Sequence, residues 1–89
     1  MSVARTIREK LTAAFDPVAL EVEDQSERHR GHAGWREGGE THFHVRIRAR
    51  AFAGRGRVEA QRMVHKALAE ELAGPIHALS LDLGGPDRP

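Results

Sequence analysis

The chain has 89 residues, which suffices for one small domain with a thin core. It contains no cysteine, so it forms no disulfide and cannot hold an iron–sulfur cluster with thiolates of its own. The net charge of +1 argues against a protein that binds nucleic acid over most of its surface. Because there is no run of about 18 apolar residues and no apolar leader segment, the sequence predicts a cytoplasmic protein without a spanning helix.

The first predicted element is a helix that begins after Ser2, whose hydroxyl can cap it, and ends before Pro17. Its apolar residues recur at helical spacing: Val3, Ile7, Leu11, Ala14 and Phe15. Apolar and acidic residues then alternate between Leu20 and Glu23, which predicts a half-buried strand.

The clearest pattern in the chain is the alternation from Glu40 to Phe52, which predicts a long central strand. Its apolar parity can seal a core and consists of Phe43, Val45, Ile47 and Ala49. The opposite parity carries imidazoles and guanidiniums: His42, His44, Arg46, Arg48 and Arg50. If the two strands pair antiparallel, Glu21 and Glu23 lie opposite part of this basic face, which gives its arginines a structural role. A binding face for phosphates or an acidic partner is the alternative.

A long polar connection, residues 25–39, separates the two strands. Connections above about 12 residues are uncommon in compact domains and are often functional. This one contains His29 and His32, and its single bulky apolar residue is Trp35. The indole either packs against the core or lies at a partner interface.

The second half of the chain begins with a turn from Phe52 to Arg57. A helical apolar stripe runs from Val58 to Ala73 and ends at Gly74-Pro75. The apolar segment from Ile76 to Leu83 predicts the last strand, and residues 84–89 form a flexible tail. The order helix-strand-strand-helix-strand predicts one α+β domain over residues 1–83, with a three-stranded sheet and helices on one face.

Six histidines are the strongest chemical signal, but no local spacing is diagnostic of a metal site. His77 shares the parity of Leu79 and Leu81, so it is expected to face inward as a hydrogen-bonded histidine at the core edge. The alternative is that the end of the strand presents its imidazole at the rim of the domain. The hydroxyls and carboxylates form no catalytic motif, so an enzyme is not expected.

The turn Gly54-Arg55-Gly56-Arg57 precedes a helix N-terminus, whose free N–H groups and partial positive charge suit an anion. A tight turn that needs the conformational freedom of glycine explains the same residues without any ligand.

Several segments, in this order and spacing, resemble the BolA family across residues 7–83. They are Leu20 to Ser26, Glu40-Thr41-His42-Phe43, Phe52-Ala53-Gly54, the helix from Arg57 to Leu72, and Ile76-His77-Ala78-Leu79. The chain departs from the usual family pattern at Gln61 and at Arg55-Gly56.

The resemblance implies a fold like the type II KH domain and a small adaptor that binds a monothiol glutaredoxin. The two proteins would share a [2Fe-2S] cluster, with one cysteine from glutaredoxin and a thiolate from glutathione, in iron homeostasis or the stress response. Carried over by position, His77 is the principal ligand and the second comes from the long connection, either His32 or His29. We expect a monomer alone, a heterodimer with this partner, and no membrane association.

Family members are also described as transcriptional regulators. In the alternative that this implies, Arg55, Arg57 and Arg62 on the second helix and the preceding turn would contact DNA phosphates.

Overall fold

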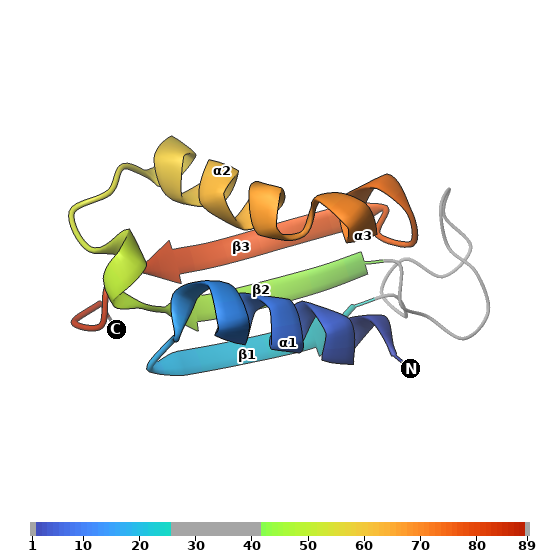
Figure 1. The fold of residues 1–89 in the computed structure, drawn as a ribbon, viewed down its shortest axis with the longest axis horizontal. Helices are drawn as coiled ribbons and strands as arrows, with labels where there is room; N and C mark the ends of the chain where they lie inside the picture. Colours follow the sequence, from blue (N-terminus) through green and yellow to red (C-terminus); the bar gives the residue numbers. More distant parts are fainter. Residues whose placement is uncertain (1, 26–41, 89) are drawn as a thin grey trace.

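The computed structural model describes residues 2–25 and 42–88, and Figure 1 shows their arrangement. The elements, in chain order, are α1 (Val3–Phe15), β1 (Ala19–Asp24), β2 (His42–Arg48), the short 3-10 helix η2 (Arg50–Phe52), α2 (Arg57–Ala67), α3 (Ala69–Ala73) and β3 (Ala78–Gly84). The predicted α+β class, the order of elements and the three-stranded sheet are confirmed. None of the helices described is long and apolar enough to cross a membrane.

The sheet has the order β1-β2-β3, so the predicted central strand is central in space as well. β2 pairs antiparallel with β1 and parallel with β3. In this register Val45 lies opposite Val22 on one side and Leu81 on the other, which places apolar residues of all three strands on one face. α1 packs against β1, α2 packs against β3, and the two helices contact each other across that face (Figure 1).

The alternation along β2 places its apolar side chains in the core, as predicted. Phe43, Val45 and Ile47 are buried, and so is Ala49 just beyond the strand. α1 contributes Ile7 and Leu11 to the same core cluster, while α2 contributes Ala60 and Val64. Burial of each large aliphatic side chain contributes roughly 1.5–3 kcal/mol, so this single cluster holds both helices on the sheet.

Predicted and observed element boundaries differ in several places; the last strand, for example, begins at Ala78 and not at Ile76. The central strand ends at Arg48, because the chain turns into η2 instead of continuing extended to Phe52. The second helix is interrupted at Leu68, whose φ of −107° and ψ of 21° are not helical. The Leu68 side chain is fully buried, so the break redirects α3 without removing this residue from the core.

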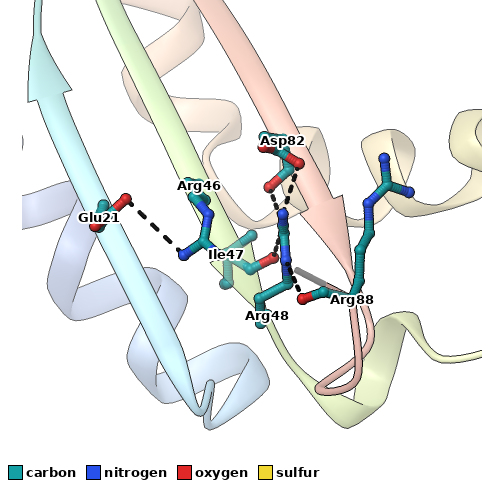
Figure 2. Close-up of polar contacts among 6 residues, drawn as sticks. All are labelled: Glu21, Arg46, Ile47, Arg48, Asp82 and Arg88. Atoms are coloured by element: carbon teal, nitrogen blue, oxygen red, sulfur yellow. Dashed lines mark hydrogen bonds and ion pairs between the residues drawn. The ribbon is translucent and has the colours of Figure 1, made fainter.

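Arg48 does not belong to an exposed basic face, which corrects the expectation from strand parity. Its side chain is 3% exposed, and its guanidinium donates to the Asp82 carboxylate at 3.0 Å and to the Asp82 carbonyl at 2.9 Å (Figure 2). Further hydrogen bonds reach the carbonyls of Ile47 and Arg88, each at 3.1 Å. The buried charge is therefore neutralised and bonded, and it fastens the segment after β3 to β2.

Arg46, in contrast, behaves as the parity predicts. It lies opposite Glu21 in the β1–β2 register, and its guanidinium is 3.9 Å from the Glu21 carboxylate (Figure 2). Both side chains are partly or largely exposed, so this ion pair contributes little free energy. Glu23 lies opposite His44 instead of an arginine.

Lys10, whose side chain is partly buried, connects α1 to α3 by an ion pair. Its ammonium nitrogen lies 2.8 Å from one carboxylate oxygen of Glu71 and 3.8 Å from the carboxylate of Glu70. The hydrogen bond to Glu71 and the negative charges of both carboxylates raise the pKa of Lys10 above its usual 10.5, against the opposing effect of desolvation. The pair helps to hold the short helix α3 against α1.

Candidate functional site

One end of the sheet, here called the histidine end, is formed by Gln25, His42 and His77, where β1 ends and β2 and β3 begin. His77 lies between the buried Ile76 and Ala78, the first residue of β3. Its side chain is exposed, so the expectation that it faces inward is wrong. The reason is local: β3 begins at Ala78, so the alternation that packs Leu79 and Leu81 against the core does not extend back to His77.

The exposed imidazole of His77 lies beside the buried imidazole of His42. The two ring centroids are 6.3 Å apart and the ring planes differ by 20°, a stacked arrangement. His42 is only 6% exposed and opposite Ala78 in the parallel register of β2 and β3, so the backbone fixes its place. A buried ring therefore lies beside, and roughly parallel to, a ring that remains open to solvent.

The histidine end also contains both flanks of the long connection. The backbone N–H of Gln25 donates to the carbonyl of His42 at 2.7 Å, so the last residue described before the connection and the first described after it are in contact. His29 and His32, the two predicted ligands of the connection, lie outside the described residues, as do Trp35, Glu40 and Thr41.

The two other histidines of the described part lie elsewhere. The imidazole of His44 is hydrogen-bonded to the hydroxyl of Ser80 on the open face of the sheet. His65 is exposed near the end of α2. Residues 2–25 and 42–88 contain no group of three or more histidine, aspartate or glutamate side chains placed to hold a metal ion. Any site built on His77 thus needs further ligands from outside this part.

The three predicted nucleic-acid contacts lie on and before α2. Arg55, Arg57 and Arg62 are all exposed. Arg55 donates to the carbonyl of Ala51 at 3.2 Å and pairs with Glu59 at 3.4 Å, which holds it near the start of the helix. Arg55 and Arg57 line the same hollow, whereas Arg62 does not.

A third arginine of that hollow, Arg88, was not among the predicted site residues. No sequence signal pointed to it, because its place depends on the bond between its carbonyl and Arg48, a residue of a distant strand.

A family model described as BolA-like protein matches residues 11–88. The chain belongs to the BolA-like family. The match includes β1, β2, α2 and β3, and with them His42, His77 and the predicted arginines. The family assignment made from the sequence motifs is thereby confirmed.

Two curated relatives illustrate the range of proteins that contain this BolA-like domain. SufE-like protein 1 of Arabidopsis thaliana is 48% identical over 79 residues, which are 84% of this chain but only 21% of that protein. The protein named DNA-binding transcriptional regulator BolA of Escherichia coli is 44% identical over 81 residues, which are 91% of this chain and 73% of the relative. BolA-like protein 1 of Mus musculus is a further relative, 42% identical over 84 residues, which are 94% of this chain and 58% of that protein.

The solved structure of BolA1 from Arabidopsis thaliana has the same fold as this BolA-like chain. The TM-score is 0.87 at 40% sequence identity, and the similarity covers 100% of this chain and 98% of the other. The mixed three-stranded sheet is therefore shared with an experimentally determined relative.

Proposed function

We propose that this BolA-like chain is an adaptor that binds a monothiol glutaredoxin and shares a [2Fe-2S] cluster with it. His77 is one ligand of that cluster, and His32 or His29 is the second ligand from this chain. The complex would act in the cytoplasm, in iron homeostasis or the stress response.

The observation that carries this proposal is the exposed imidazole of His77 at the histidine end. Both flanks of the segment that contains His29 and His32 lie at the same end, joined by the bond between Gln25 and His42. The family resemblance and the position of His77 thus agree on one end of the molecule. A partner that approaches this end would meet the imidazole without any opening of the core.

The donor chemistry of the chain fits a shared cluster. A [2Fe-2S] cluster takes four protein or thiol ligands, and the chain has histidines but no cysteine. Imidazoles can come from this chain, while thiolates would come from glutaredoxin and glutathione. When bound, the cluster supplies a redox-active iron centre whose potential rises as histidine replaces cysteine.

His42 takes the role of a positioning residue in this proposal. Ligand histidines are commonly oriented by a neighbouring group, and here the buried ring of His42 lies against the ring of His77. A neighbouring ring that limited the rotation of His77 before the partner arrives would reduce the conformational entropy lost on binding.

The test is reconstitution of the complex. The purified chain is mixed with a monothiol glutaredoxin, glutathione, ferrous iron and sulfide, and the visible absorption and circular dichroism are recorded. His77→Ala should change the cluster spectrum or abolish it, while His65→Ala, which removes another exposed imidazole, should leave it unchanged. His29→Ala and His32→Ala then identify the second ligand. An unaltered spectrum in His77→Ala would refute the ligand assignment.

A second candidate function is DNA binding, favoured by the three exposed arginines at α2 and by the name of the Escherichia coli relative. Phosphate contacts of this kind make affinity fall steeply with salt. Gel-shift titrations with a duplex promoter fragment at several salt concentrations test it. Binding at physiological salt that is insensitive to substitution of Arg55, Arg57 and Arg62 would exclude this surface.

A further inference from the structure

At the opposite end of the sheet from His77, three arginines surround one hollow of about 540 Å³. Arg55 and Arg57 come from the turn and first residue of α2, and Arg88 comes from the segment after β3. Gly54 and Gly85 also line the hollow, and neither has a side chain to fill it. We call this group, with its three guanidiniums, the arginine hollow.

The backbone of Arg88 is held in this place by a hydrogen bond from a buried side chain. Its carbonyl accepts a hydrogen bond from Arg48, which is itself 97% buried and fixed to Asp82. Its side chain methylenes lie directly against Gly84, where any Cβ would collide with them. Figure 2 shows the rest of the side chain leading away from Arg48, and Arg88 is one of the residues that line the hollow.

The charges of the hollow are not balanced within the described residues. Arg55 pairs with Glu59, and the carboxylate of Asp82, which also borders the hollow, pairs with Arg48. Arg57 and Arg88 have no carboxylate partner in residues 2–25 and 42–88. Two guanidiniums that border one concave space, each without a carboxylate partner of its own, favour the binding of an anion there.

The backbone reinforces this preference. α2 has 11 residues, and its N-cap is Gly56, which has no side chain to satisfy the first N–H groups of the helix. These donors and the positive end of the helix dipole lie beside Arg57.

We propose that the arginine hollow binds the terminal phosphate of a small phosphorylated molecule, such as a nucleoside monophosphate. A volume of about 540 Å³ falls within the range of small-molecule sites, roughly 300–1,000 Å³. A phosphomonoester carries nearly two negative charges, which matches the two guanidiniums that lack a partner. A duplex is less suitable for the hollow, because Arg62, the third arginine of the predicted DNA surface, lies outside it.

The experiment uses the full chain without glutaredoxin. Backbone amide resonances of residues 56–59 are followed by NMR during titration with adenosine monophosphate, inorganic phosphate and adenosine, at constant ionic strength set with chloride. We expect both phosphates to bind with shifts at these amides, and adenosine to produce none. Arg57→Ala and Arg88→Ala should each weaken binding by about tenfold or more.

Three variants make the result specific. Arg62→Ala removes an equal charge from the same helix but lies outside the hollow, so it should bind phosphate like the parent chain. Gly84→Ala keeps every charge but displaces the Arg88 side chain, so it should weaken binding. His77→Ala should bind normally, which separates this proposal from the cluster proposal. The spectrum of each variant away from the hollow verifies its fold.

Three outcomes would overturn the proposal. The first is that adenosine monophosphate shifts these amides no more than chloride does. The second is an equal loss in Arg62→Ala and Arg88→Ala, which would indicate diffuse attraction. The third is that a short DNA duplex binds with dependence on Arg88 while adenosine monophosphate does not, which would assign the hollow to backbone phosphodiesters.

Discussion

The imidazoles of His42 and His77 lie in a stacked arrangement, with centroids 6.3 Å apart, although one ring is buried and the other is exposed. A contact of this kind makes the orientation of the outer ring depend on the inner one. His42→Ala should therefore broaden or shift the His77 side chain resonances in the free chain. His42→Phe, which retains an aromatic ring, should preserve them better. Identical His77 spectra in the parent chain and His42→Ala would contradict the positioning role.

The buried guanidinium of Arg48 is expected to dominate the electrostatic part of the stability. Arg48→Ala leaves the Asp82 carboxylate and several carbonyls without their donor, which should cost about 2–4 kcal/mol of unfolding free energy. Arg46→Ala on the same strand removes only an exposed pair at 3.9 Å and should cost less than about 1 kcal/mol. Urea denaturation of both variants measures the difference. Equal losses would mean that the bonds around Arg48 stabilise the fold no more than the exposed pair of Arg46 does.

The Lys10–Glu71 pair predicts a dependence of stability on pH at the alkaline end. Because the pKa of Lys10 is raised in the folded state, its contribution is fully present below the unfolded pKa of about 10.5 and disappears as the pH rises through the folded value. The difference in unfolding free energy between the parent chain and Lys10→Met should thus be constant from neutral pH to about pH 9.5 and shrink above pH 10.5. Urea denaturation across this range is the measurement. A difference that grows as the pH rises would contradict a raised pKa of Lys10 in the folded state.

The two glycines before α2 should respond oppositely to the same substitution. Gly54 has a φ of +73°, so Gly54→Ser forces a side chain into the left-handed region and should cost about 1 kcal/mol. Gly56 is an N-cap with a φ of −69° and open space at its Cβ position, so Gly56→Ser adds a capping hydroxyl and should gain a few tenths of a kcal/mol. Thermal unfolding of the two variants, compared with the parent chain, gives the sign of each change in stability. A gain in both would show that the turn tolerates any residue.

Strand parity predicted most of the fold because it depends only on local periodicity. Phe43, Val45 and Ile47 lie in the core and Arg46 faces Glu21, all as the alternation required. The same reasoning failed at His77, since parity extrapolated by one residue past the start of a strand has no backbone pairing to enforce it.

The features missed are those that depend on contacts between distant parts of the chain. No sequence pattern near Arg48 predicts its hydrogen bonds to Asp82 and to the carbonyl of Arg88. The arginine hollow follows from that same contact, which is why Arg55 and Arg57 were predicted as site residues and Arg88 was not. His29 and His32 were predicted from position in the family pattern, and this prediction stays open.

β2 has His42 at its first residue and Arg48 at its last, so one strand joins the histidine end to the arginine hollow. Six residue-to-residue steps of about 3.3 Å separate these ends by roughly 20 Å, more than twice the screening length of about 8 Å at physiological salt. A charge bound at one end therefore has little electrostatic effect on binding at the other end. If both proposals hold, a cluster partner at the histidine end and a phosphate in the arginine hollow would bind simultaneously, each with an affinity set by its own end. The domain would then connect the two ligands.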